Sequence, residues 1–250
     1  MVMNIQNSIL ILILVYFLAY EPVVGLLTYR KFVRRQMVDS TERIRYYGKL
    51  LGGLWFLVAC VFAFMLFYGF SLGEVGINRV TLRFSELNKL FVIIVATAAL
   101  GLFLLLVYQL IAARLSIKYR QKLMNTDIPQ DISILLPDTN GERKLWTVIS
   151  ITAGLTEEFL YRGFLSLALT QLFPAINLPL TAIICSIIFG LGHTYQGVSG
   201  VVKTGLLGLF FHALYIATGS IIPGVLLHFA IDLSAKDTQK YNEKNITEKT

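Results

Sequence analysis

The sequence predicts an all-α fold, a polytopic membrane helical bundle with about seven transmembrane helices. The first observation is composition: 56% of the 250 residues are hydrophobic, 15% are charged, and the mean hydropathy is +0.67. A soluble domain of this size needs more polar surface. The second observation is that long apolar runs alternate with basic connections, which is the pattern of a chain that crosses a bilayer repeatedly.

Seven apolar runs account for the predicted spans. They cover residues 8–27, 50–70, 91–113, 145–172, 180–195, 201–217 and 221–234. Glu21 beside Pro22 is interpreted as a kink or an interfacial turn in the first run. The whole chain, 1–250, is predicted to be a single integral membrane domain with three parts. These are three N-terminal spans with basic cytoplasmic loops (1–144), a motif-bearing core (145–235) and a polar cytoplasmic tail (236–250).

Basic residues set the predicted orientation. Lys and Arg gather in the connections 30–49 and 114–144, which are therefore expected to be cytoplasmic, with the amino terminus outside the cell membrane and the carboxy terminus inside. The net charge of +7 is assigned to this orientation, and no nucleic-acid partner is expected. Cys60 and Cys185 both lie in apolar runs, so neither a disulfide framework nor a thiolate metal site is indicated.

Three charged residues interrupt the fourth apolar run. Each ionised side chain near the middle of a span costs about 2.5–3.5 kcal/mol, so Glu157, Glu158 and Arg162 need partners, water or a function. On a helix Glu158 and Arg162 share a face at i and i+4, whereas Glu157 points about 100° away from Glu158. The spacing predicts one structural ion pair and one available glutamate.

The three histidines of the chain all lie in its carboxy-terminal half. Phe189 and His193 lie one helical turn apart, as do His228 and Asp232. His212 has no such partner on its own helix and is expected to make a polar contact between spans. Polar faces within lipid must turn toward one another, so the sequence predicts a small shared cavity. Its expected members are Glu157, Glu158, Arg162, His193, His228 and Asp232.

These motifs resemble those of a known family. Glu157-Glu158-x-x-x-Arg162, then Phe189-x-x-x-His193, then His228-x-x-x-Asp232 is similar to the three ordered motifs of the CAAX-protease and bacteriocin-processing family of intramembrane proteases. This family includes the type II CAAX prenyl endopeptidases. The resemblance covers residues 145–235, while the first half of the chain matches only in being membranous.

The resemblance implies an intramembrane endopeptidase that acts on a peptide or membrane-protein substrate. Peptide hydrolysis needs an activated water, a proton donor for the leaving amine and donors that face the oxyanion. Glu157 is implied as general base and His193 as its partner at the water. Glu158 is implied to pair with Arg162, and His228 to face the oxyanion. Asp232 can donate a hydrogen bond only when protonated, so orienting His228 is the role expected for it. Phe189 supports His193.

Several alternatives stay open at this point. No cofactor is expected on the preferred interpretation, but Glu157, His193 and His228, with Asp232 as a further candidate, would also suit zinc. The second functional class is a non-catalytic membrane protein of the same fold, such as a bacteriocin-immunity factor or a peptide-binding scaffold. A transporter is the third, because intramembrane acids and histidines also build proton relays, although no broken-helix pair recurs in two halves.

Overall fold

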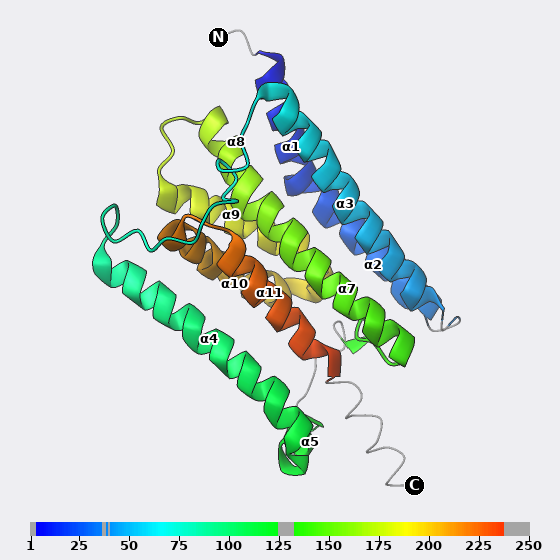
Figure 1. Cartoon of the computed structure of the whole chain (residues 1–250). Helices are drawn as coiled ribbons and strands as arrows, with labels where there is room; N and C mark the ends of the chain where they lie inside the picture. Colours follow the sequence, from blue (N-terminus) through cyan, green and yellow to red (C-terminus); the bar gives the residue numbers. More distant parts are fainter. Residues whose placement is uncertain (1–3, 37–38, 40, 125–132, 238–250) are drawn as a thin grey trace.

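The computed structural model describes residues 4–36, 39, 41–124 and 133–237. Regular structure in this part of the chain is entirely helical (Figure 1). The predicted cytoplasmic tail lies outside the described residues from position 238 onward. The same holds for part of the basic connection 114–144, at positions 125–132.

The N-terminal half forms three long rods and one short helix. The first rod is continuous but contains a π-helical segment, η1, between α1 and α2. The elements are α1 (Ile5–Val15), η1 (Tyr16–Tyr20), α2 (Glu21–Gln36), α3 (Glu42–Tyr68), α4 (Lys89–Leu115) and α5 (Ile117–Met124).

The C-terminal half begins with a rod made of α7, η2 and α8, which is interrupted by a π-helical segment, η2, as the first rod is by η1. Two shorter helices and one long helix complete the bundle. The elements are α7 (Asn140–Glu157), η2 (Glu158–Phe164), α8 (Leu165–Leu172), α9 (Leu178–Gly192), η3 (Thr194–Gln196), α10 (Gly197–Thr218), α11 (Ile222–Ser234) and η4 (Ala235–Asp237).

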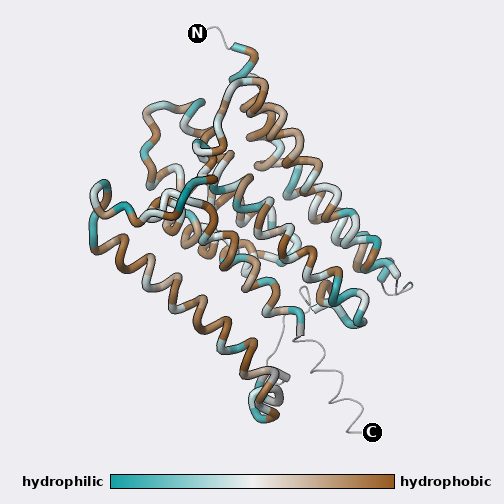
Figure 2. The backbone as a smooth tube through the Cα atoms, viewed as in Figure 1, coloured by the Kyte–Doolittle hydropathy of each residue, from teal (hydrophilic) through white to brown (hydrophobic). Residues whose placement is uncertain are grey.

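The protein is a helical membrane bundle. Among the described residues, four helical stretches are long and apolar enough to cross a bilayer, namely Ile5–Gln36, Glu42–Tyr68, Lys89–Ala113 and Thr194–Thr218. Leu178–Gly192 and Ile222–Ser234 are shorter apolar helices. Hydrophobic residues, coloured brown, occupy the middle parts of the long helices (Figure 2). Each of the seven predicted runs coincides with a helix, while seven crossings of the membrane stay a prediction.

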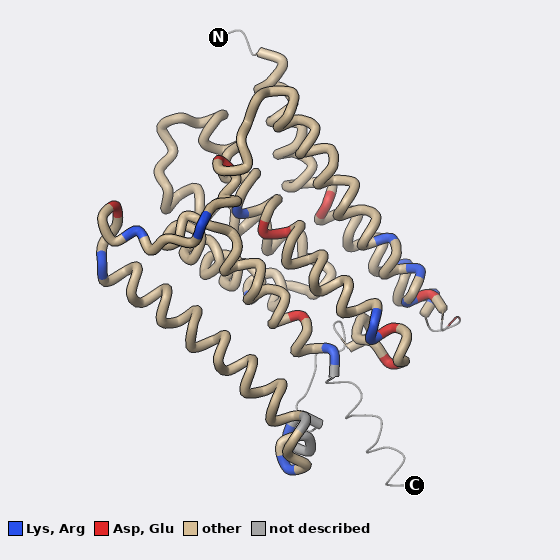
Figure 3. The backbone as a smooth tube through the Cα atoms, viewed as in Figure 1, with Lys and Arg blue, Asp and Glu red and all other residues tan. Residues whose placement is uncertain are grey.

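The first basic connection is shorter than predicted. The sequence pattern indicated a loop over 30–49, but α2 continues to Gln36 and α3 begins at Glu42. Arg34 and Arg35 occupy the last turn of α2, where cations interact favourably with the helix dipole and the unpaired carbonyls. Much of the positive charge is therefore carried on helix ends, and basic segments gather at the lower end of the bundle (Figure 3).

The start of α7 is fixed to α3 by a buried arginine. Arg43 Nη1 lies 2.6 Å from Asp138 Oδ2 and 3.0 Å from Glu142 Oε2, and its Nε donates to the carbonyl of Ile134 at 3.2 Å. Glu142 also completes a capping box with Thr139. This set of contacts holds the residues before α7 against α3 and so sets where α7 enters the bundle.

Glycines allow the helices around the site to approach closely. A Cβ atom on Gly190 of α9 would lie 2.7 Å from the carbonyl oxygen of Val201 on α10. A Cβ atom on Gly154 of α7 would lie 3.0 Å from the carbonyl oxygen of Val225 on α11. A real Cβ atom is essentially never found at the first distance, and the second is unusually tight, so glycine at these positions lets α9 approach α10 and α7 approach α11 closely.

Candidate active site

The charged motif lies where the fourth predicted span changes from α-helix to π-helix. Glu157 is the last residue of α7 and Glu158 is the first residue of η2, whose seven residues are all buried. A π-helical turn replaces i→i+4 by i→i+5 hydrogen bonds and often occurs at functional sites. Residue patterns alone predicted a continuous α-helix here, so the π-helical segment is a feature that sequence reasoning missed.

Glu158 and Arg162 form the ion pair that their spacing predicts. Arg162 Nη1 lies 3.0 Å from Glu158 Oε1, and their side chains are 1% and 0% exposed. The guanidinium carbon of Arg162 also lies 4.1 Å from the ring centre of Phe189 and 5.2 Å from that of Phe211. Two aromatic faces and one carboxylate therefore surround the buried cation, and this combination compensates its loss of water.

His228 is held by Glu158 across the interface between α11 and η2. His228 Nδ1 lies 2.9 Å from Glu158 Oε1, the same oxygen that faces Arg162. A carboxylate paired with a guanidinium accepts hydrogen bonds only, so Nδ1 is the donor and its proton is fixed. Gly224 on α11 makes room for this contact, because a Cβ atom there would lie 2.8 Å from Glu158 Oε2.

The other nitrogen of His228 faces two further carboxylates. Nε2 lies 3.8 Å from Glu157 Oε2 and 3.7 Å from Asp232 Oδ2, distances that exceed a direct hydrogen bond. Glu157 Oε2 is buried and makes no hydrogen bond with the described residues. Asp232 was expected to orient His228 through a ring nitrogen, but Glu158 makes the short contact instead.

His193 lies at the end of α9 and is oriented by its own helix. Its Nδ1 is 2.8 Å from the carbonyl oxygen of Phe189, which can only accept, so Nδ1 carries a proton and Nε2 is left as the acceptor of the neutral ring. The Phe189 ring contacts both imidazoles, with its centre 4.8 Å from His193 and 6.3 Å from His228. Within the described residues, no direct hydrogen bond or ion pair joins His193 to Glu157.

The structure thus brings five of the six predicted cavity residues into one chain of polar contacts. It places the sixth, His193, against Phe189, whose ring also contacts His228. Acidic and basic segments are accordingly visible in the middle of the bundle as well as at its ends (Figure 3). The five residues in contact are Glu157, Glu158, Arg162, His228 and Asp232.

The zinc alternative can be compared with the same geometry. Among the described residues, no group of three or more His, Cys, Asp or Glu side chains has an arrangement that could hold a metal ion. Glu157, His193 and His228 do not form such a group in this arrangement, and zinc dependence stays a prediction to be tested.

A residue of the first rod also reaches this region. The hydroxyl of Tyr161 in η2 donates to Glu21 Oε2 at 2.7 Å, and Thr194, directly after His193, donates to the carbonyl of Pro22 at 2.9 Å. The sequence signal was the acidic residue inside an apolar run, which was interpreted as a kink or interfacial turn. Glu21 lies within a continuous helical rod, directly after η1, so it is not at a turn, while a kink there stays a prediction.

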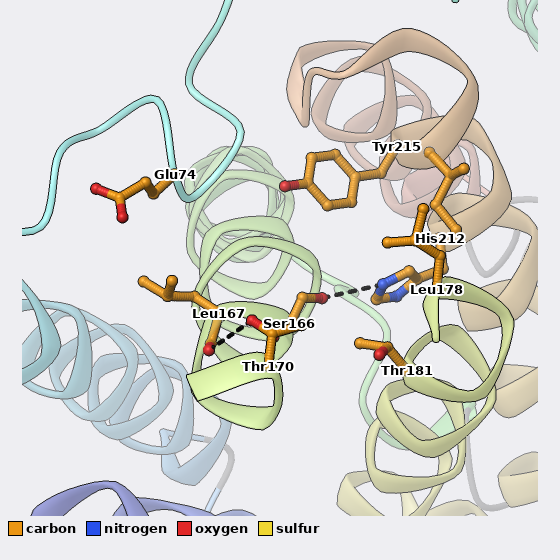
Figure 4. A pocket seen from close by; sticks show the side chains of 9 residues that line it. Glu74, Ser166, Leu167, Thr170, Leu178, Thr181, His212 and Tyr215 are labelled. Carbon is orange, nitrogen blue, oxygen red and sulfur yellow. Dashed lines mark hydrogen bonds between the residues drawn. The ribbon is translucent and has the colours of Figure 1, made fainter. Parts of the chain in front are cut away.

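His212 makes the contact between spans that was expected of it. Its Nε2 lies 3.0 Å from Ser166 Oγ on α8, and both residues line a separate cavity of about 190 Å³ (Figure 4). Glu74 and Tyr215 also line this cavity, and the Tyr215 ring is drawn beside it in the close-up. None of its lining residues belongs to the predicted catalytic set, so this cavity is separate from the candidate active site.

Comparison with known families gives one match. Residues 140–234 match a family model called Rce1-like and described as "Type II CAAX prenyl endopeptidase Rce1-like". The match contains all three motifs and covers less than half of the chain. Comparisons with curated proteins and with solved structures found no match.

Proposed function

Residues 140–234 form a domain of the Rce1-like family of type II CAAX prenyl endopeptidases, and from this premise we propose that the protein is an intramembrane endopeptidase. The observation that carries the proposal is the contact between Glu157 and His228. It pairs an available carboxylate with an imidazole whose other nitrogen is already fixed by Glu158. Such an arrangement suits proton transfer at a bound water.

Glu157 is the proposed general base. Its Oε2 is buried and makes no hydrogen bond with the described protein atoms, so this oxygen is available to a water molecule. Glu157 takes one proton from this water as the water oxygen attacks the carbonyl carbon of the scissile peptide bond. It then passes that proton to the leaving amine nitrogen when the C–N bond breaks, which returns the carboxylate to its starting state.

His193 is the proposed second contact of the attacking water. The Phe189 carbonyl fixes the proton on Nδ1, so Nε2 can accept the hydrogen bond from the water proton that Glu157 does not take. Phe189 therefore serves two groups, because its carbonyl orients His193 and its ring covers Arg162. This gives the motif Phe189-x-x-x-His193 a physical reason.

His228 is the proposed oxyanion donor. Its Nδ1 proton is committed to Glu158, so the ring donates toward a developing oxyanion only when Nε2 is also protonated. Asp232 and Glu157 both face Nε2 and can stabilise that form by charge. Asp232 is thus proposed to act on His228 through space rather than through a hydrogen bond.

The proposed substrate is a peptide or membrane protein that reaches the site from the bilayer. The chain belongs in a membrane because four helical stretches in its described part are long and apolar enough to cross one. We further propose that this is the cell membrane, with the amino terminus outside. Cleavage of a prenylated carboxy-terminal peptide is the narrower expectation that the family description suggests.

The test is a comparison of membranes that carry the parent, Glu157→Ala or His193→Ala. Peptides released by the parent and missing from both substituted proteins, at equal amounts of folded protein, would support the proposal and identify the substrate. If all three membranes release the same peptides while the parent still binds a peptide, the non-catalytic scaffold is favoured. Glu86→Ala is the matched control, because Glu86 is 65% exposed and pairs only loosely with Arg83.

A further inference from the structure

Glu21 and Pro22 lie in the N-terminal half, outside the matched family domain, and both contact residues next to the proposed catalytic groups. Glu21 accepts from Tyr161, which is four residues after Glu157. The carbonyl of Pro22 accepts from Thr194, which directly follows His193. Two adjacent residues of the first rod therefore hold both motif-bearing elements.

The contact with Tyr161 is set deep in the bundle. Tyr161 is 2% exposed, and its ring lies edge-on to Phe17 of η1 and to Phe189 of α9, each at 5.0 Å between centres. The two π-helical segments, η1 and η2, thus meet through Phe17 and Tyr161. Because Phe189 orients His193 and covers Arg162, a displacement of Tyr161 would be passed directly to both.

Gly192 shows how little space this contact leaves. A Cβ atom at Gly192 would lie 3.0 Å from the Tyr161 hydroxyl and 3.9 Å from the Glu21 carboxyl group. The residue immediately before His193 is therefore packed against the Tyr161–Glu21 hydrogen bond. An acid within an apolar rod also costs free energy, which is a reason to expect a function for it.

We propose that Glu21 is a positioning residue, which acts through Tyr161 and together with Pro22 sets the placement of His193 relative to Glu157. Only the expected effect on kcat rests on the proposed protease function. The structural part, that Glu21 fixes the surroundings of His193, can be measured without any cleavage.

The kinetic test uses Glu21→Ala, Glu21→Gln, Tyr161→Phe and the double substitution Glu21→Ala/Tyr161→Phe in the full-length protein. Misplacement of reacting groups lowers turnover, so Glu21→Ala and Tyr161→Phe should each lower kcat about 10- to 100-fold with little change in KM. Glu21→Gln keeps an acceptor oxygen and should recover most of the turnover. The double substitution should be no worse than either single one, because both remove one hydrogen bond.

The structural test uses the three histidines as probes. With only three imidazoles in the chain, ring ¹⁵N spectra of histidine-labelled protein should give three resolvable sets of signals. Glu21→Ala and Tyr161→Phe should shift the His193 signals and leave those of His212, which contacts Ser166, in place. Tyr20→Phe is the matched control, since Tyr20 is 56% exposed on the same rod.

Each outcome decides the inference. Unshifted His193 signals in both single substitutions, or additive losses of turnover in the double one, would overturn it. Shifted His193 signals support it even if the parent cleaves nothing, in which case the protease proposal alone fails. Tyr161→Phe removes a single oxygen atom from a buried ring, so it keeps the test decisive if Glu21→Ala does not fold.

Discussion

His228 Nδ1 and Arg162 Nη1 lie 2.9 Å and 3.0 Å from one and the same oxygen of Glu158. This shared oxygen joins α11 to η2 and relates the structural ion pair to the histidine of the third motif. The second glutamate of the motif therefore does more than neutralise an arginine. It also determines which nitrogen of His228 carries the fixed proton.

This relationship predicts that Glu158 matters more to His228 than Asp232 does. Glu158→Gln should lower kcat about 10- to 100-fold, because a neutral amide weakens both contacts and lets the ring move. Asp232→Asn should cost only about threefold, since Asp232 lies 3.7 Å from Nε2 without a hydrogen bond. Rates are measured at equal amounts of folded protein. A larger loss in Asp232→Asn than in Glu158→Gln would show that the assignment is reversed.

Arg162→Ala should destabilise the protein as well as inactivate it. Removal of one partner from a buried ion pair leaves the other charge uncompensated and costs about 3–5 kcal/mol. Glu158 would be left at 0% exposure with His228 as its remaining partner. Thermal unfolding in detergent and the yield of folded protein measure the effect.

Arg45→Ala is the control for this prediction. Arg45 is 59% exposed and pairs with Asp39 at 2.8 Å, and exposed pairs contribute about 0–1 kcal/mol. If both substitutions lower the unfolding temperature equally, burial is not what makes Arg162 important.

The positions of the helices followed from the sequence because apolar runs of sufficient length have few alternatives in a membrane. Leu145 to Leu172 was predicted as one span, and α7, η2 and α8 form one rod through Leu172. The π-helical segments could not be predicted, since no residue pattern distinguishes Glu158–Phe164 from an α-helix. The loop at 30–49 was predicted too long because charged residues were interpreted as loop, although they also favour helix ends.

Spacing within one helix predicted which residues share a face, and polarity predicted that His212 and the motif residues meet across helices, but the individual partners across helices could not be predicted. The i,i+4 spacing predicted that Glu158 meets Arg162, and it does. The same rule also paired His228 with Asp232, but His228 Nε2 lies 3.7 Å from Asp232 Oδ2, too far for a hydrogen bond. The hydrogen bond of His228 is made by Nδ1 to Glu158, which lies on another helix. Which helix faces which depends on close packing, for example at Gly224. The sequence shows that position 224 is a glycine, but it does not show that Glu158 packs against it.

Glu142 should make stability sensitive to acid. Burial alone would raise its pKa, but the backbone N–H groups of Thr139 and Asp138 and the Arg43 guanidinium together hold the pKa of Glu142 below its usual value. A lowered folded-state pKa contributes stability above the unfolded value of about 4.3, and this contribution is lost as the pH falls through the folded pKa. Glu142→Gln should therefore unfold more easily than the parent at pH 7, by about 1–3 kcal/mol.

The measurement for Glu142 is the unfolding midpoint in detergent at pH 7 and at about pH 3.5, a value below the unfolded pKa. The difference between the parent and Glu142→Gln should shrink at the lower pH. A difference that stays constant or grows there would mean that the ionised carboxylate is not what stabilises the start of α7.

The Ser166–His212 contact should be structural. Ser166→Ala removes a 3.0 Å hydrogen bond between α8 and α10, which costs about 1 kcal/mol of stability and leaves cleavage intact, because neither residue contacts the proposed catalytic groups. Cleavage rate and unfolding temperature are measured on the same preparation. A large loss of cleavage at unchanged stability would assign a catalytic or substrate-binding role to the cavity of Figure 4.

Chelation separates the two ways of activating water. We expect activity to survive a strong chelator, because the proposed mechanism uses Glu157 and two imidazoles whose protons are fixed by Phe189 and Glu158. Residual activity is measured after chelation, and again after zinc is added back. Activity that disappears with chelation and returns with zinc would replace the glutamate-type mechanism by a metal-dependent one. In that case Glu157, His193 and His228 would have to move into a ligand set that the described residues do not form here.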